Sequence, residues 1–332
     1  MTDTITSAAF ALHAIREYTD ADNPSAFLAV SEGNSYFSLP DRPGVIVYRT
    51  AGRYLVQFGG PFAPAESYLD LLRGFVEFAK EQDRTIVSVQ LQRHDADRYA
   101  RHGFTVNQIG ASYAVELASF TLAGTRFMQL RNKISRALRN GLTVVEAGLD
   151  DWYDKMRALD QVWLPSKGEH ARPLEYLVGQ YGGPMQEHRR LFVGILGGQL
   201  AGYISYSPVY GGKPGWMHDL SRRIPGNSPG IMEAINKAAI DTFTAEGVPW
   251  LHFGFTPFTS LRTEWEPAGR SSGFAWFMNM LWEHGEAVYP AATQLAYKQK
   301  WAPNLVLPEY VAFQGPASIT GFVHIFRAAN AL

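Results

Sequence analysis

The stretch that decides the fold spans residues 216–257 and reads WMHDLSRRIPGNSPGIMEAINKAAIDTFTAEGVPWLHFGFTP. Its residue pattern predicts a short strand, a loop rich in proline and glycine at 225–230, a helix at 231–246 and a buried strand at 251–255. The first strand carries four polar or charged residues, which are His218, Asp219, Arg222 and Arg223. This order of elements is typical of an α/β unit.

The start of the predicted helix is an expected anion site. The first N–H groups of a helix have no partner within the helix and carry partial positive charge, so a phosphate can dock there. Arg222 and Arg223 stand just before the loop that leads into this helix. The unit therefore predicts recognition of a phosphate or another anion.

The rest of the chain also alternates strands and helices. We expect strands at 27–30 and 85–91, an amphipathic helix at 65–82 and a closing hairpin around Gly110. The second half repeats this order of elements without repeating the sequence. A duplicated α/β fold is therefore expected.

Length and composition narrow the class of protein. A chain of 332 residues favours two domains, and a net charge of -1 gives no global basic field for nucleic acid. There is no cysteine, and the nine histidines show neither an i, i+4 pair nor an HExxH motif, so no metal site is expected. No signal peptide and no long apolar run is seen, which predicts a soluble cytoplasmic protein.

A basic helix is expected at 127–140, in a stretch from Thr125 to Thr143 that has no acidic residue. Its cations are Arg126, Arg131, Lys133, Arg136 and Arg139. One interpretation is a solvated face whose last cations suit the helix dipole. The other is a surface that follows the phosphates of tRNA. The sequence leaves both open.

Four motifs follow one another along the chain. They are LAGTRFMQLRNKISRALRNGLTVVE at 122–146, Trp163 with Lys167-Gly168-Glu169, HDLSR at 218–222 before PGIME at 229–233, and AYKQKWAPNLVLPEYVAF at 296–313. In this order they resemble the soluble C-terminal domain of bacterial lysylphosphatidylglycerol synthetases. The resemblance covers nearly the whole chain, although Ser221 and Arg223 differ from the residues usual in that family.

The resemblance implies an α/β (α+β) fold of two tandem acetyltransferase-like (GNAT) lobes, each a mixed β-sheet flanked by helices. The first lobe would span 1–141, including the connecting helix at 126–140, and the second, catalytic lobe would span 142–332. The implied activity is transfer of an amino acid from aminoacyl-tRNA, as co-substrate and without a cofactor, to a hydroxyl or amine. The acceptor could be a lipid headgroup, a peptide or a small molecule. The chain departs from membrane-bound members in lacking their transmembrane half.

Such a transfer needs a positioned ester, a base for the nucleophile and a donor for the developing oxyanion. Asp219 is the first candidate, as base or as anchor for the ammonium group of the amino acid, and its alternative role is an ion pair with Arg222 or Arg223. Glu233 and Lys300 are the other candidate catalytic residues. The expected substrate-binding residues are Lys167, Glu169, Arg172, His218, Arg222, Arg223 and Lys298, and Lys298 is also the alternative to Lys300.

Three other interpretations are weaker. An acyl-CoA-dependent N-acyltransferase would need a pyrophosphate loop, and the prolines of RRIPGNSPG remove N–H donors from it. A non-catalytic module that binds RNA or lipid remains an alternative from a different class. The G-x-S-x-G match at 226–230 predicts a helix cap rather than a hydrolase nucleophile, because two arginines and a proline precede it.

Overall fold

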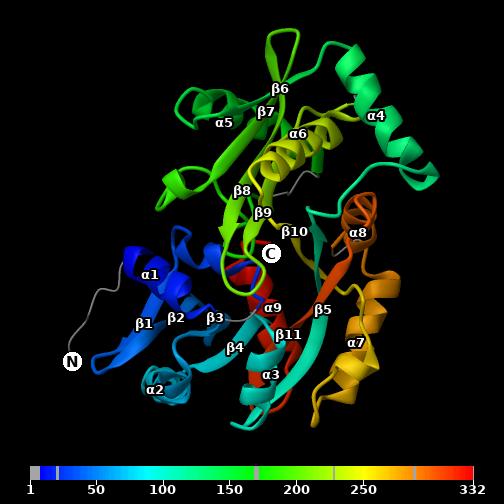
Figure 1. Ribbon diagram of the computed structural model, residues 1–332. Helices are drawn as coiled ribbons and strands as arrows, with labels where there is room; N and C mark the ends of the chain where they lie inside the picture. The colour runs from blue at the N-terminus through cyan, green and yellow to red at the C-terminus, as the bar shows by residue number, and fades with distance from the viewer. Residues whose placement is uncertain (1–7, 20–21, 168–171, 227–228, 287–288, 332) are drawn as a thin grey trace.

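The computed structural model describes residues 8–19, 22–167, 172–226, 229–286 and 289–331. Across these residues eleven strands form one sheet in the order β1-β2-β3-β4-β11-β5-β10-β9-β8-β7-β6 (Figure 1). The strands are β1 Ser35–Leu39, β2 Arg42–Ala51, β3 Tyr54–Phe62, β4 Thr85–Leu91, β5 Phe104–Glu116, β6 Thr143–Ala147, β7 Arg190–Leu196, β8 Gln199–Val209, β9 Gly215–Arg223, β10 Trp250–Pro257 and β11 Leu305–Gln314.

Helices cover both faces of the sheet. They are α1 Ala8–Tyr18, α2 Ala65–Glu81, α3 Arg93–Ala100, α4 Met128–Arg139, α5 Tyr153–Trp163, α6 Ile231–Ala245, α7 Ser272–His284, α8 Ala291–Gln299 and α9 Ile319–Ala328. The first half of the sheet comprises β1–β5 and β11, and the second half comprises β6–β10. On the first half of the sheet, α1, α7 and α9 share one buried cluster, and α2 and α3 share another. In the second half, α4, α6 and α8 pack on one face and α5 on the other.

The predicted α/β class is confirmed, although the strands of both halves form one mixed sheet flanked by helices. Parallel pairing between named strands of the described chain occurs at β3–β4 and β9–β10, once in each half, as expected of a duplicated pattern. The two halves are joined edge to edge, because β5 pairs with both β11 and β10. The last strand, β11, lies between β4 and β5. The division between residues 141 and 142 stays a prediction.

Two predicted elements are wrong. The apolar run at 27–30 is not a strand but part of a 3-10 helix, Ala26–Val30, whose five residues are all buried. A short apolar run does not distinguish a strand from a buried helical turn. The hairpin expected around Gly110 is instead the continuous strand β5. A Cβ at Gly110 would meet the carbonyl oxygen of Thr256 at 2.3 Å, so this glycine permits close approach of β10 instead of a turn.

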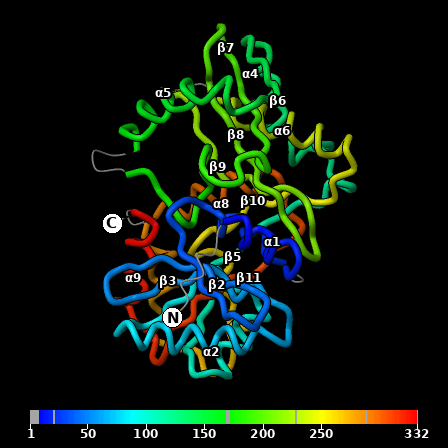
Figure 2. Tube along the Cα trace, turned by 90° about the vertical axis from the view of Figure 1, so that its left-hand side faces the viewer, coloured from blue at the N-terminus to red at the C-terminus, as the bar shows by residue number. Residues whose placement is uncertain are grey.

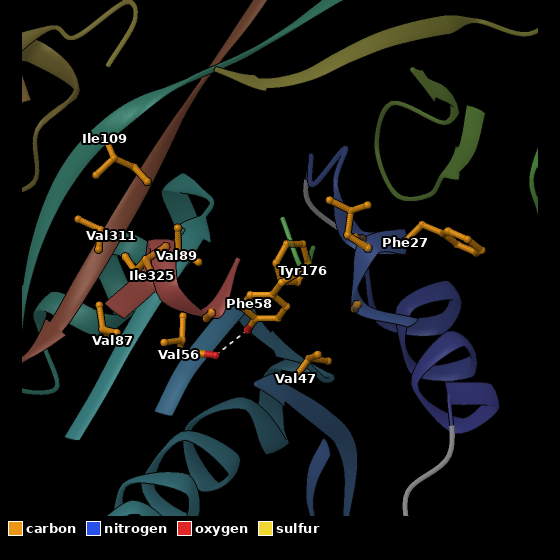
Figure 3. Packing of buried hydrophobic residues seen from close by; sticks show 14 of the residues in the cluster. Phe27, Val47, Val56, Phe58, Val87, Val89, Ile109, Tyr176, Val311 and Ile325 are labelled. Carbon is orange, nitrogen blue, oxygen red and sulfur yellow. Dashed lines mark hydrogen bonds between the residues drawn. The ribbon is translucent and has the colours of Figure 1, made fainter. Parts of the chain in front are cut away.

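A segment of the second half enters the core of the first. Tyr176 follows α5 in the chain, is 1% exposed and packs against Phe58 among the residues shown in Figure 3. Its hydroxyl donates a hydrogen bond of 2.6 Å to the carbonyl oxygen of Val56. Figure 2 shows the first half, with α2 at its outer edge, below the second half that carries α4 and α6. The packing of Tyr176 ties these halves together.

Candidate active site

Strand β9 loses its pairing to both neighbours near Asp219. On one side, Tyr206 of β8 pairs with His218 and Ser205 pairs with Leu220, which leaves Asp219 as an extra residue in a β-bulge. On the other side, pairing with β10 ends at Met217, although the described parts of both strands continue. Bulges redirect side chains and recur next to active sites. Asp219 therefore lies at an interruption of the pairing on both sides of β9.

The carboxylate of Asp219 is buried beside an arginine that the sequence did not single out. Arg189 Nε lies 3.7 Å from Asp219 Oδ2, and both side chains are 0% exposed. The alternative partners expected from the sequence, Arg222 and Arg223, are not the ones found. Burial raises the pKa of Asp219 to about 6, while Arg189 opposes this rise. Within the described chain, neither carboxylate oxygen has a hydrogen-bond partner.

Arg189 also lacks described hydrogen-bond partners for part of its guanidinium group. Its Nε and Nη2 have no hydrogen-bond partner among the described residues, and its guanidinium carbon lies 4.8 Å from the ring centre of Phe27 in the first half. The hydroxyl of Ser207, on β8, is also buried without a described partner. Buried polar atoms are normally paired, so an unpaired group among them indicates a ligand, a water molecule or a catalytic role.

A close approach by another segment fixes the bulge. The amide of Gly179 donates a hydrogen bond of 3.0 Å to the carbonyl oxygen of Asp219. A Cβ at Gly179 would lie 2.4 Å from Cγ of Asp219. Only glycine leaves room for both the hydrogen bond and the carboxylate at this point.

His218 is surrounded by aromatic rings that include residues of the α6 and α8 side. Its ring centre lies 5.7 Å from that of Tyr206, 5.9 Å from that of Tyr297 and 6.4 Å from that of Phe253. Burial, with a further effect of the Lys298 charge, lowers the pKa of His218 to about 3. The imidazole is therefore neutral near pH 7.

The two lysines of the C-terminal motif have different surroundings. Lys300 Nζ pairs with Glu233 Oε1 at 3.0 Å, and its side chain is 35% exposed. The Lys300 ammonium also lies 5.3 Å from the ring centre of Tyr297, which connects this pair to His218. Lys298 is 5% exposed and donates hydrogen bonds to two main-chain carbonyls of β10. Thus Lys300 and Glu233 are brought together, whereas Lys298 is enclosed.

A basic cluster forms around Trp163 at the end of α5. The guanidinium carbon of Arg222 lies 3.9 Å from the Trp163 ring centre, and the ammonium of Lys167 lies 5.0 Å from it. The pKa of Lys167 is lowered by burial and then by the nearby charges of Arg223 and Arg222. Three cations held close together in this way favour an anionic ligand.

This cluster does not lie at the start of α6, where the sequence predicted an anion site. Arg222 pairs across the ladder with Tyr203, whose ring belongs to the cluster under α5, whereas α6 covers the opposite face. Arg223 donates to the carbonyl oxygens of Ile224 and Gly226 in its own loop. Alternation along β9 therefore turns Arg222 away from α6, whereas Arg223 lies on the face that α6 covers, where a Cβ at Gly202 would meet both Arg223 and Ile231.

The other predicted binding residues are peripheral or not described. Arg172 is exposed, and Glu169 lies outside the described residues, as does Ser228. On α4 and the residues before it, four arginines are exposed and Lys133 is half-buried; the arginines are Arg126, Arg131, Arg136 and Arg139. Arg131 donates to the carbonyl oxygens of Leu122 and Gly124, which fixes it at the start of the helix.

Comparison with known proteins assigns the family. A sequence model of the family described as "Phosphatidylglycerol lysyltransferase, C-terminal" matches residues 13–313. The chain belongs to this family. It is 24% identical to the phosphatidylglycerol lysyltransferase of Bacillus subtilis over 322 residues, and 22% identical to the bifunctional lysylphosphatidylglycerol biosynthesis protein LysX of Rhodococcus opacus over 297 residues.

Two solved structures share the fold. The C-terminal domain of a lysylphosphatidylglycerol synthetase from Agrobacterium fabrum matches with a TM-score of 0.76 at 20% identity, covering 98% of each chain. The structure of L-PGS from Bacillus licheniformis matches with a TM-score of 0.77 at 18% identity, covering 99% of this chain and 97% of that one. The chain spans 36% of the Bacillus subtilis relative and 26% of the Rhodococcus relative, although it is itself covered to 92% and 86%.

For this member of the lysyltransferase family, sequence reasoning missed Arg189. The available signal was the Arg189-Arg190 pair directly before an apolar strand, because an arginine at such a position must find an anion or an aromatic ring. No group of three or more potential ligands for a metal ion occurs among the described residues. Over that same part of the chain, no helix combines the length and apolarity needed to cross a bilayer.

Proposed function

We propose that this chain transfers an amino acid from aminoacyl-tRNA to a hydroxyl-bearing acceptor, and that the transfer takes place at Asp219. The observation that carries this proposal is the group of buried polar atoms of Asp219, Arg189 and Ser207 that have no described hydrogen-bond partner at the bulge of β9. Family membership supports it, because relatives over this region are named phosphatidylglycerol lysyltransferases.

The chemistry is an exchange of one ester for another. The acceptor hydroxyl oxygen attacks the carbonyl carbon of the aminoacyl ester, and its proton passes to Asp219. The tetrahedral intermediate then expels the ribose oxygen of the tRNA, which takes the proton back from Asp219. A carboxyl group whose pKa is raised to about 6 by burial is ionised at pH 7 yet basic enough for this exchange. No cofactor is needed, because the ester is already activated.

The oxyanion of the intermediate needs a cationic or N–H donor close to the ester. Lys300 is our candidate, because its ammonium is partly exposed and Glu233 fixes it at 3.0 Å. His218 stands between Tyr206 and Tyr297, and as a neutral ring it positions the substrate without adding charge.

We place the acceptor phosphate at the basic cluster around Trp163. Arg222, Arg223 and Lys167 offer the donors and charge that a phosphodiester requires. We therefore propose a phospholipid headgroup with a free hydroxyl, such as phosphatidylglycerol, as acceptor and lysine as the amino acid, in line with the names of the relatives.

The exposed arginines of α4 and of the residues just before it are proposed to contact tRNA. Arg126, Arg136 and Arg139 are exposed, and no acidic residue lies between Thr125 and Thr143 to oppose them. Such contacts are electrostatic, so the affinity for tRNA should fall steeply with salt.

The proposal is tested with total tRNA charged with labelled amino acids and three acceptor samples: phosphatidylglycerol vesicles, phosphatidylcholine vesicles and a metabolite extract. Label should move from tRNA into chloroform-soluble material only with phosphatidylglycerol. Arg222→Lys keeps the charge but loses the planar guanidinium, and should raise the KM for lipid more than it changes kcat.

Label that appears in a water-soluble product would replace the lipid with another acceptor. Loss of label at the rate of spontaneous hydrolysis, with consumption of acetyl-CoA by the same protein, would favour the acyl-CoA interpretation. Binding of tRNA or lipid without any turnover would favour a non-catalytic module.

A further inference from the structure

A buried lysine lies where β10 leaves β9. Lys298 Nζ donates hydrogen bonds of 2.7 Å to the carbonyl oxygen of Gly254 and of 3.0 Å to that of Phe255. These two residues follow His252, which is the last residue of β10 that pairs with β9. Buried carbonyl groups need a donor wherever a ladder is interrupted. Lys298 supplies that donor.

A buried carboxylate accompanies this lysine. Glu309 of β11 is 0% exposed and accepts a hydrogen bond from the hydroxyl of Ser112 on β5. Burial lowers the pKa of Lys298 to about 7 and raises that of Glu309 to about 7, and the charge of each opposes the shift of the other. A core tolerates a buried ammonium and a buried carboxylate only if their opposite charges compensate each other. The compensating charges lie at the junction of β11, β5 and β10.

Lys300 contrasts with Lys298 although both belong to one motif. Its side chain is 35% exposed, and its ammonium pairs with Glu233 of α6 and with no carbonyl of β10 that the structure records. The ammonium of Lys300 is therefore partly open to solvent, whereas that of Lys298 is enclosed by protein atoms and already donates to two backbone carbonyls.

We propose that Lys298 is a positioning residue that, with Glu309, holds β10 apart from β9 beside Asp219, and that of the two lysines only Lys300 meets the substrate. Without the ammonium, two buried carbonyls lose their donor. Strand β10 then loosens, or it closes towards β9 and narrows the space at Asp219. The catalytic consequence rests on the proposed function, but the structural one does not.

The experiment is hydrogen–deuterium exchange, measured by mass spectrometry on the full chain. Lys298→Met keeps a long apolar side chain and removes the ammonium. Exchange in the peptide that contains 253–257 should become at least about tenfold faster, which corresponds to about 1.4 kcal/mol of local stability. The matched control is Lys300→Met, two residues away, which should leave exchange in this peptide unchanged.

Equal exchange in Lys298→Met and the wild type would overturn the proposal, and so would an equal increase in both lysine variants. If Lys298→Met does not fold, Glu309→Gln removes the compensating charge at nearly constant shape and should accelerate exchange in the same peptide. Failure of both variants to fold would mean a global role in stability and would also contradict the proposal.

Steady-state kinetics distinguish a Lys298 that positions β10 from a Lys298 that contacts the substrate. Lys298→Met should lower kcat and leave the KM for aminoacyl-tRNA within about twofold of the wild type, because it acts through β10. A raised KM with an unchanged kcat would indicate direct contact with the substrate and would contradict the proposal. If the wild type transfers no amino acid, the proposed function fails, while the exchange data still decide the role of Lys298.

Discussion

At the scale of single residues, the charge of Asp219 determines the expected pH dependence. Its side chain is fully buried, and its pKa is raised to about 6. The carboxyl group must be ionised to accept the proton of the acceptor, so kcat/KM should fall as pH drops below about 6. Asp219→Asn should lower kcat by roughly 10²- to 10⁴-fold and remove this acidic limb. A variant that transfers at the wild-type rate would exclude Asp219 as the base.

The neutral state of His218 has a separate effect on stability. Its pKa is lowered by burial to about 3, whereas an unfolded chain keeps a value near 6.5. The unfolded state therefore binds more protons below pH 6.5, so the contribution of His218 to stability is complete above that pH and is lost as pH falls. Between these two pKa values, each unit by which the pH falls lowers the free energy of unfolding by about 1.4 kcal/mol.

His218→Asn should make the free energy of unfolding less dependent on pH between pH 4 and 6, by about that slope relative to the wild type. Urea titrations at three pH values measure it. The same substitution at His284, whose side chain is 73% exposed, controls for the loss of an imidazole. An identical slope in His218→Asn and the wild type would mean that His218 is protonated in the folded state at these pH values.

Single residues also mark the limit of the sequence analysis. Asp219 could be singled out in the sequence because a polar pair interrupts an apolar strand there, whereas Lys300 was suggested by the resemblance of the C-terminal motif. The partner of Asp219 was not visible: Arg189 lies thirty positions earlier, and a bulge that no periodicity reveals turns the carboxylate towards it. The contact between Asp219 and Arg189 depends on the register of the strands, which cannot be read from the sequence pattern.

At the scale of elements, long periodic segments were predicted well, whereas the four-residue apolar run at 27–30 was not. The helix expected at 231–246 is found at Ile231–Ala245, because fifteen residues give a clear apolar stripe. The segment at 27–30 is too short for such a pattern, and it forms a helical turn. Helix α9, Ile319–Ala328, was not predicted at all, although it packs its buried residues against the first half.

The contact between α4 and α6 gives a prediction at this scale. Gly230, before α6, has a φ of 92°, and a Cβ there would meet the carbonyl oxygen of Lys133 at 2.2 Å. Gly141, after α4, has a φ of 91° and nothing within 4 Å of that position. Gly141→Ala should cost about 1–2 kcal/mol for the backbone alone, and Gly230→Ala about 1–3 kcal/mol more.

Urea unfolding measures the loss of free energy of unfolding in each variant. The two losses can be compared directly, because both glycines have nearly the same φ. Equal losses in both would show that α4 moves freely away from α6. In that case the basic face of α4 would not be held in a fixed position relative to the second half.

At the scale of the whole molecule, one sheet joins two halves, and a few buried side chains fix their relation. Tyr176 brings a segment of the second half into the core of the first, and its hydroxyl is bonded to Val56. Tyr176→Phe should destabilise the chain by about 1–3 kcal/mol, because a buried carbonyl loses its donor.

Tyr153→Phe is the control for Tyr176→Phe, since Tyr153 is 42% exposed, and it should change the free energy of unfolding by less than about 0.5 kcal/mol. Thermal and urea unfolding measure both variants. A loss confined to a first transition, with the second unchanged, would mean that the halves unfold separately. A single cooperative transition is the result expected from a continuous sheet.

The duplicated order of elements was visible in the sequence, but the joining of the halves was not. The pairing of β11 with β4 and β5 places the end of the chain in the first half of the sheet. Only long-range pairing determines this, and no local pattern encodes it. The sequence could therefore indicate the class and the repeat, while the packing of Arg189 between Asp219 and Phe27 required the structure.

The central claim is that Asp219 serves transfer from aminoacyl-tRNA to a lipid headgroup. The most direct measurement follows labelled lysyl-tRNA mixed with excess protein and phosphatidylglycerol vesicles in a single turnover. We predict label in the lipid phase at a rate that exceeds spontaneous hydrolysis, no such label after RNase treatment of the donor, and at least about a hundredfold slower transfer by folded Asp219→Asn. Label that remains on tRNA with the wild type, or equal transfer by wild type and variant, would contradict the account.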